Sequence, residues 1–235
     1  MRNVQLVVLD FDGTVADTMP YLVDLAAGIL MDRYGMTQDE ARRAYIETTG
    51  LPFVQQMEII FPGDARNGEA VGLFEALKRE NMGRFGLFPD VAGTVSGLRN
   101  MGIKVCLSSG SYKDLIDDFL YRQGLTVDLA MGYRPGFEKG RDHFGYAMQR
   151  FRLGPEVTVF VGDSIKDGER ARDSGIRFIG KAGLVDAGEF RRRFPEAPVI
   201  ASLGEILHII QRHEPPGPAT KTGPSYREGG QPPSG

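Results

Sequence analysis

Hydrophobic residues along the chain form short, nearly continuous runs that alternate with amphipathic segments. The runs are rich in β-branched residues and lie at Val4–Leu9, Ile103–Leu107, Val127–Met131, Val157–Val161, Ile176–Ile179 and Val199–Ile200. Such runs are typical of strands that are buried on both faces of a parallel sheet. Segments with helical spacing of apolar residues follow several of them, as at 115–120 and 142–153. The alternation predicts an α/β fold built on a doubly wound parallel sheet.

One segment, 16–87, interrupts this alternation. It contains no convincing strand, but helical patterns lie at Tyr21–Tyr34, Thr37–Thr48, Phe53–Phe61 and Gly68–Asn81. Joints rich in glycine and proline, such as Gly50-Leu51-Pro52, separate these patterns. We therefore expect residues 16–87 to form a helical insertion beside the sheet, and residues 1–15 and 88–213 to form the sheet domain.

Local patterns also predict where two helices begin and where the folded part ends. Ser111 and Asp114 resemble a capping box before the apolar stripe at 115–120, and Ser202 with Glu205 has the same form before the last helix. The segment 214–235 is rich in Pro and Gly and lacks Leu, Ile, Val and Phe. It cannot bury enough apolar surface to offset the entropy of ordering, so we expect a disordered tail.

Composition mainly excludes other classes of protein. The 235 residues are 41% hydrophobic, with 28 Lys+Arg, 31 Asp+Glu and a net charge of −3, which suits a globular protein and gives no electrostatic reason to expect nucleic acid as a partner. Cys106 is the single cysteine, so a reducing compartment is expected. The run Val4–Leu9 is too short for a signal peptide, and no stretch is long enough to span a membrane. We expect a cytoplasmic protein with no membrane partner.

The strongest chemical signal is the sequence LDFDGT at 9–14, where the first predicted strand ends. Asp10 and Asp12 stand two residues apart before a glycine, and ligands of open α/β sheets bind at the carboxyl ends of strands. One carboxylate of such a pair can bind a cation or attack an electrophile while the other moves protons. Taken alone, the pair is explained equally well as a turn in which the aspartates cap backbone amides.

A second acidic pair follows the predicted strand Val157–Val161. Asp163 and Asp167 stand where this strand gives way to a helix. Facing Asp10 and Asp12, they would repel them strongly unless a hard divalent cation lay among them. Gly-Asp-Ser is by itself a common strand–helix turn, and the combination of two acidic strand ends favours the metal site.

Two further segments supply groups that suit an anion. Ser109 and Gly110 lie between a predicted strand and a helix, where a hydroxyl and backbone amides can bind a phosphate, although Ser111 could simply be a helix cap. Lys139 precedes the predicted helix at 142–153. A lone lysine is usually solvated, but its position just before the strand of Asp163 favours a role in the site.

These motifs, in this order, resemble those of the haloacid dehalogenase-like phosphohydrolases. The resemblance rests on LDFDGT, a Ser at the end of the second strand, a Lys, and VGDSIKDGERA at 161–171. Phe88-Pro89-Asp90-Val91, leading into LRNMG at 98–102, resembles the re-entry from a helical cap in the phosphoglycolate phosphatase-like branch. The resemblance implies a Rossmann-like core with the segment 16–87 as an inserted α-helical cap.

The resemblance also implies roles for single residues. Asp10 would be the nucleophile that forms an aspartyl-phosphate, and Asp12 would protonate the leaving oxygen and then activate water. Mg²⁺ would be held by the carboxylates of Asp10 and Asp163 and by the backbone carbonyl of Asp12. Lys139 stands in Lys-Gly-Arg, where many relatives have Lys-Pro.

The remaining implied contacts concern the phosphate and the cap. Ser109 with Gly110 would bind the phosphoryl oxygens, Lys139 would neutralise charge beside the nucleophile, and Asp167 would orient that lysine or the water shell of the metal. Because related caps use a loop at the joint between helices, contacts to the substrate are expected from Tyr21, Pro52 and Phe53.

The expected activity is that of a Mg²⁺-dependent phosphatase acting on a small phosphorylated metabolite, with 2-phosphoglycolate as the best single candidate. An acid at position 12 favours phosphate esters over the substrates of dehalogenases. Alternatives are a mutase resembling β-phosphoglucomutase, weakened because Leu51-Pro52-Phe53 stands where that mutase has an arginine, an inorganic pyrophosphatase, or a phosphoacceptor signalling module. A monomer or a homodimer is equally compatible with the sequence.

Three other features of the sequence have simpler explanations. The segment GIRFIGKA at 175–182 nearly matches a phosphate-binding loop, but it coincides with a predicted strand. Cys106 lies within an apolar strand and is expected to be buried and inert. Basic residues of the insertion, including Lys78 and Arg79, could steer an anionic substrate, but solvated helix faces explain them equally well.

Overall fold

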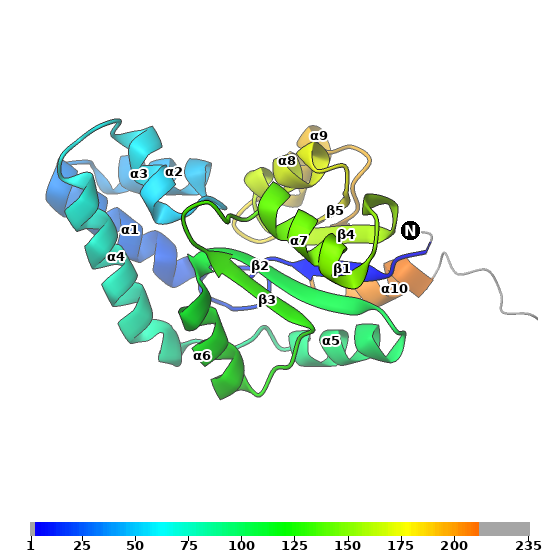
Figure 1. Cartoon of the computed structure of the whole chain (residues 1–235). Coiled ribbons are helices and arrows are strands. Elements are labelled where there is room, and N and C mark those ends of the chain that lie inside the picture. The colour runs from blue at the N-terminus through cyan, green and yellow to red at the C-terminus, as the bar shows by residue number, and fades with distance from the viewer. Residues whose placement is uncertain (1–2, 212–235) are drawn as a thin grey trace, which may run out of the picture.

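A parallel six-stranded sheet forms the centre of the computed structural model, which describes residues 3–211 (Figure 1). The strands have the order β3-β2-β1-β4-β5-β6. They are β1 (Leu6–Leu9), β2 (Lys104–Tyr112), β3 (Leu129–Tyr133), β4 (Thr158–Gly162), β5 (Arg177–Lys181) and β6 (Val199–Ile200). Each lies on one of the predicted runs, so the doubly wound parallel α/β fold is confirmed. Strand order reverses between β1 and β4, which places a crevice at their carboxyl ends.

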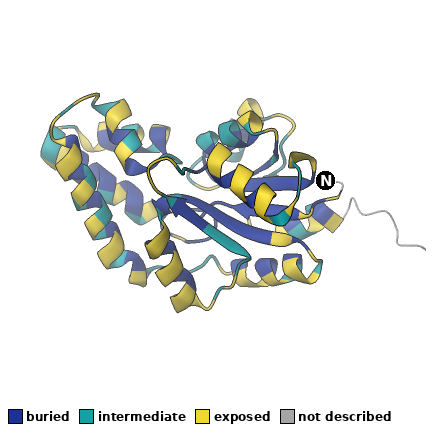
Figure 2. Ribbon diagram, in the orientation of Figure 1, coloured by how far each residue is buried: buried dark blue, intermediate teal, exposed yellow. Residues whose placement is uncertain are grey.

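Helices cover both faces of the sheet. One face is covered by α5 (Val91–Asn100), α6 (Lys113–Gln123) and α10 (Glu205–Gln211), and the other by α7 (Arg141–Phe151), α8 (Ile165–Asp173) and α9 (Ala187–Arg193). Alternate residues of β1 enter the two cores: Val7 and Leu9 face the first set of helices, whereas Leu6 and Val8 face the second. Figure 2 shows β1 and β4 buried between these layers, whereas the edge strand β3 is partly exposed. This burial explains why the strand runs are apolar without alternation.

The remaining α-helices form a separate bundle beside the carboxyl ends of the strands (Figure 1). This helical bundle consists of α1 (Met19–Tyr34), α2 (Gln38–Thr48), α3 (Phe53–Ile60) and α4 (Asn67–Asn81). A short 3₁₀ turn at Met82–Arg84 follows α4, and another at Pro155–Val157 precedes β4 in the sheet domain. The bundle has its own hydrophobic core, in which the rings of Phe53 and Phe74 stack with centroids 4.0 Å apart. All predicted helical patterns in the segment 16–87 correspond to these helices.

The chain enters and leaves the helical bundle through two adjacent backbone segments, at 15–17 and 86–88. The amide of Asp17 donates to the carbonyl of Gly86 at 3.1 Å, and the amide of Phe88 donates to that of Val15 at 3.1 Å. The helical bundle is therefore joined to the sheet at one paired crossing. No helix in the part of the chain that the structure describes is long and apolar enough to cross a membrane.

One predicted helix start is wrong and another is confirmed in part. Ser111 and Asp114 do not form a capping box, because β2 continues to Tyr112 and α6 begins at Lys113 without a side-chain cap. At the last helix, the Glu205 carboxylate accepts a hydrogen bond from the amide of Ser202 at 2.9 Å, which is one half of the predicted capping box, while the amide of Glu205 donates to the backbone carbonyl of Ser202 at 3.3 Å. The tail predicted at 214–235 lies outside the described residues.

Candidate active site

Asp10 stands immediately after β1 and is buried. Its amide donates to the carbonyl of Val161 at 2.8 Å, so the pairing of β1 with β4 fixes its backbone. The turn that follows depends on Gly13, which has φ of +79°. A Cβ at this position would lie 2.0 Å from Oδ2 of Asp163, so only glycine allows the two strand ends to approach this closely.

The second strand end is shaped by a capping box. Ser164 Oγ accepts from the amide of Asp167 at 3.1 Å, and the Asp167 carboxylate accepts from the amide of Ser164 at 3.2 Å. This reciprocal cap starts α8 and turns the Asp167 side chain back toward Asp10. Asp163, which immediately precedes Ser164, lies in the turn between β4 and α8 and is also buried.

Lys139 bridges two of these buried carboxylates. Its Nζ lies 2.7 Å from Oδ1 of Asp10 and 2.8 Å from Oδ1 of Asp167. Burial lowers the pKa of Lys139, but the two carboxylates outweigh this effect and the net shift is upward, so the ammonium stays charged. The structure thus brings the predicted lysine to the predicted nucleophile, with Asp167 holding it from the other side.

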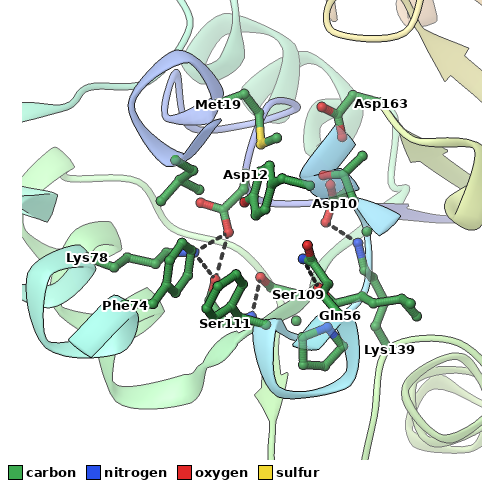
Figure 3. Close-up of a pocket in the computed structure, with 18 of the residues that line it drawn as sticks. Asp10, Asp12, Met19, Gln56, Phe74, Lys78, Ser109, Ser111, Lys139 and Asp163 are labelled. Carbon is green, nitrogen blue, oxygen red and sulfur yellow. Dashed lines mark hydrogen bonds and ion pairs between the residues drawn. The ribbon is translucent and has the colours of Figure 1, made fainter. Parts of the chain in front are cut away.

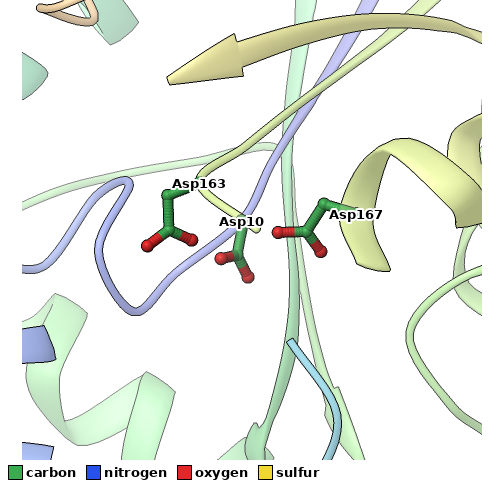
Figure 4. Close-up of side chains that lie close together, drawn as sticks. All are labelled: Asp10, Asp163 and Asp167. Atoms are coloured by element: carbon green, nitrogen blue, oxygen red, sulfur yellow. The ribbon is translucent and has the colours of Figure 1, made fainter. Parts of the chain in front are cut away.

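Three carboxylates crowd together at this point, as Figure 4 shows. Oxygen atoms of Asp10, Asp163 and Asp167 all lie within 4.8 Å of one another, and the three side chains are buried. Burial raises the pKa of Asp10 to about 6, despite the charge of Lys139, and burial with the neighbouring charges raises that of Asp163 well above its usual value. A hard divalent cation would relieve this repulsion, so the donor set suits Mg²⁺.

Asp12 points into a cavity that the sheet domain and the helical bundle enclose (Figure 3). The cavity has a volume of about 50 Å³, room for a few water molecules. Of the predicted site residues, it is lined by Asp10, Asp12, Pro52, Phe53, Ser109, Gly110, Lys139 and Asp163. Tyr21 lies elsewhere: its hydroxyl donates to the carbonyl of Leu77, and its ring packs on Phe85.

The phosphate-binding segment that we predicted lies on the wall of this cavity. Ser109 is buried, and its Oγ accepts from the amide of Ser111 at 3.0 Å. Gly110 approaches the helical bundle closely, because a Cβ there would lie 3.3 Å from the backbone nitrogen of Pro52. On the same side, Arg170 donates to the carbonyl of Gly50. The joint at 50–52 thus rests directly on strand β2 and helix α8 of the sheet domain.

Comparison with known proteins settles the family. A sequence model described as haloacid dehalogenase-like hydrolase matches residues 7–181. The chain belongs to this family. It is 25% identical over 184 residues to a phosphoglycolate phosphatase from Synechococcus elongatus, covering 74% of this chain and 81% of the relative. It is 22% identical over 237 residues to a phosphoglycolate phosphatase from Vibrio vulnificus, covering 89% and 97%.

Solved structures agree in fold. A haloacid dehalogenase-like family hydrolase from Streptococcus pneumoniae superposes with a TM-score of 0.74 at 19% identity, covering 89% of this chain and 99% of that one. Together with the curated relatives, the family assignment identifies this chain as a phosphatase of the phosphoglycolate phosphatase-like branch.

Sequence reasoning missed the part that Lys78 plays in this phosphatase. The lysine belongs to α4, yet its side chain is only 6% exposed. Its Nζ lies 2.7 Å from Oδ2 of Asp12 and 2.6 Å from Oγ of Ser111. A signal was available, because Lys78 follows Phe74 by four residues and Ala70 by eight, which places it on the apolar face of its helix. Arg79, beside it in sequence, is instead half-exposed and paired with Asp114.

Cys106 and most of the segment 175–182 lie in strands, as the sequence predicts. Cys106 is buried, and burial raises the pKa of its thiol to about 12. The segment 175–182, which resembles a phosphate-binding loop, contains strand β5, and the lysine of this strand makes two contacts. Lys181 Nζ donates to the carbonyl of Gly13 at 3.0 Å and lies 3.8 Å from the centre of the Phe88 ring. It thereby supports the turn that carries Asp12.

Proposed function

We propose that this phosphatase is Mg²⁺-dependent and hydrolyses a small phosphomonoester, with 2-phosphoglycolate as the best candidate, through an aspartyl-phosphate on Asp10. The observation that carries the proposal is the position of Asp10. It is buried at the end of β1, paired with Lys139, and it lines the same cavity as Asp12 and Ser109. The names of the curated relatives support phosphoglycolate, and the small volume of the cavity supports a small leaving group.

We assign the catalytic core to residues 1–15 and 88–213 and the cap to residues 16–87. Separate hydrophobic cores and the paired crossing beside Ala16 and Leu87 support this division. The helical bundle closes the cavity over the ends of the strands, so this cap would exclude bulk water from the reacting groups.

The first chemical step is an exchange at phosphorus. A carboxylate oxygen of Asp10 forms a bond to the phosphorus atom while the bond from phosphorus to the ester oxygen breaks. Asp12 in its protonated form donates a proton to that leaving oxygen, which departs as an alcohol. Burial raises the pKa of Asp12, but its contacts with Lys78, Ser111 and Thr18 lower it overall, so the free protein holds this group mainly as the carboxylate and the protonated form is the reactive one. Water then attacks the phosphorus of the aspartyl-phosphate, Asp12 accepts the proton of the water, and phosphate leaves with Asp10 restored.

The surrounding groups stabilise the charge on the transferred phosphoryl group. The Ser109 hydroxyl and the Gly110 amide would donate to its oxygens, and Lys139 supplies a fixed positive charge beside Asp10. Because little covalent chemistry is needed in phosphoryl transfer, positioning and positive charge of this kind account for most of the catalysis. Asp167 acts through Lys139, whose ammonium it holds at 2.8 Å.

The metal would be held by the carboxylates of Asp10 and Asp163 and by the backbone carbonyl of Asp12. The buried carboxylate cluster supports this assignment, since three acidic groups within 4.8 Å need a compensating charge beyond that of Lys139. When bound, Mg²⁺ supplies positive charge that offsets the repulsion between the nucleophile and the phosphate.

Phosphate release from a panel of phosphorylated metabolites, measured with Mg²⁺ and with EDTA, tests this proposal. We expect turnover of 2-phosphoglycolate that requires Mg²⁺ and is abolished by Asp10→Asn in a protein that keeps its circular dichroism spectrum. Asp32→Asn, at an exposed position on α1, removes the same charge and should leave turnover unchanged. Equal turnover in EDTA would contradict the metal requirement, and full activity of Asp10→Asn would contradict the nucleophile.

A further inference from the structure

Lys78 is the positively charged group that the helical bundle contributes to the cavity. Among the described residues that line it, the cations are Lys78 and Lys139. Lys139 is engaged by Asp10 and Asp167, both of which are buried with it. The leaving-group side of a bound phosphomonoester would therefore meet Lys78 as its nearest cation.

The contacts of Lys78 leave it able to bind a ligand. An ammonium group has three N–H donors. Within the described part of the chain, the hydrogen bonds of its Nζ run to Asp12 Oδ2 and Ser111 Oγ, at 2.7 and 2.6 Å. Ser111 in turn donates to the same oxygen of Asp12 at 2.7 Å, which fixes the position of the ammonium (Figure 3). One donor remains for an acceptor that enters the cavity.

The rest of the wall that the helical bundle provides offers little to an anion. Leu22, Phe53 and Phe74 give it apolar surface, and the hydroxyl groups of Tyr45 and Thr49 on this wall carry no charge. Gln56 also lines the cavity, but its amide is already bonded: its Nε2 donates to the carbonyl of Leu51 at 2.9 Å, and its Oε1 accepts from Thr48 at 3.0 Å. An apolar surrounding strengthens a charged contact.

Glu75 lines the same wall, one turn of α4 before Lys78. Its carboxylate disfavours an anion on its own side of the cavity, although burial raises the pKa of this group. Attraction by Lys78 and repulsion by Glu75 therefore confine an anionic group to the part of the wall beside Asp12.

We propose that Lys78 determines substrate specificity by binding a carboxylate on the leaving group, and that the substrates are small phosphomonoesters with an anionic group one carbon from the ester carbon. This inference rests on the proposed phosphatase function and defines its substrate class. Since the same ammonium touches Asp12, a carboxylate held by Lys78 brings the ester oxygen beside the acid that protonates it. A leaving group without this carboxylate would bind without bringing its ester oxygen into this alignment.

The test compares 2-phosphoglycolate with ethyl phosphate, in which a methyl group replaces the carboxylate. We expect the wild-type protein to prefer 2-phosphoglycolate by roughly 10- to 100-fold in kcat/KM, the range of a charge-assisted hydrogen bond. Lys78→Met should reduce this ratio to about one, chiefly by raising KM for 2-phosphoglycolate, and Lys78→Arg should keep much of it. Using the ratio cancels any effect of the substitution on Asp12 that both substrates share.

Arg79→Met is the matched control, because it removes a positive charge from the next position of α4 but lies outside the cavity. It should keep the wild-type ratio. An unchanged ratio in Lys78→Met would overturn the inference while leaving the phosphatase function intact. If Lys78→Met does not fold, the wild-type protein alone still tests the inference. Equal turnover of ethyl phosphate, phosphoethanolamine and 2-phosphoglycolate by the wild type would overturn the inference. Absence of hydrolysis of every phosphomonoester would instead refute the proposed function, and the inference with it.

Discussion

His143 connects strand β2 to the segment that carries Lys139, and it does so as a neutral side chain. It is fully buried on α7, and its Nδ1 lies 3.0 Å from Oγ of Ser108 in the middle of β2. Burial, with a smaller contribution from the charge of Lys139, lowers the pKa of His143 to about 4. We expect acid to weaken the fold at this residue before the carboxylates are fully protonated.

The size of the effect follows from the difference in pKa between the folded and unfolded chain. The unfolded histidine titrates near its ordinary value of about 6.5, so below that pH the unfolded state binds a proton that the folded state refuses. Stability is therefore present above about 6.5 and is lost as pH falls toward 4. From pH 7.5 to pH 5 the loss is about 2 kcal/mol, and it approaches about 3 kcal/mol below the folded pKa.

Urea unfolding of the wild type and His143→Gln at pH 7.5 and pH 5 measures this loss. The variant should be less stable at pH 7.5, and its deficit should shrink by about 2 kcal/mol at pH 5, because glutamine cannot take up the proton. His208→Gln, on the exposed side of α10, should show no such change between the two pH values. A deficit for His143→Gln that is the same at both would refute the reasoning.

Three further results are expected. Gly13→Ala should lower the free energy of unfolding by at least about 1–2 kcal/mol, because φ is +79° and an added Cβ would meet a carboxylate oxygen. Gly72→Ala, in open space on α4, should instead raise the free energy of unfolding by about 0.5–1 kcal/mol, and urea titration compares the two variants. Cys106 should react with a thiol reagent only in urea, since its thiol is buried with a pKa of about 12; rapid labelling of the native protein would contradict this. Asp167→Asn should lower kcat by about 10- to 100-fold by releasing Lys139, and wild-type kcat would show that this contact is dispensable.

Much of the fold was predictable because its signals are local. The strand runs are apolar on both faces, as burial between two helical layers requires, and a strand overlaps each predicted run, although β2 continues to Tyr112, past the run that ends at Leu107. The aspartates of the site were predictable for the same reason: each stands next to a strand end, and parallel strands bring their carboxyl ends to one edge. Neither step requires knowledge of contacts across the chain.

The contacts between the helical bundle and the sheet were not predictable in this way. Ser111 has the local pattern of a helix cap, but it lies on β2, and its hydroxyl bonds to Asp12, 99 residues away in sequence. Lys78 and Arg79 are adjacent in sequence and carry the same charge, and only the packing of α4 makes the lysine buried and the arginine half-exposed. Lys181 supports the turn at Gly13 across 168 residues. Such roles depend on tertiary distances that a single sequence does not contain.

The central claim is that Asp10 becomes phosphorylated during turnover. Borohydride reduces an acyl phosphate but leaves a free carboxylate intact, so quenching the reaction with it and mapping peptides by mass spectrometry locates the phosphorylated residue. We predict conversion of Asp10 to homoserine, only when 2-phosphoglycolate and Mg²⁺ are both present. Modification at Asp12 or Asp163 instead, or none at Asp10 during steady turnover, would contradict the account.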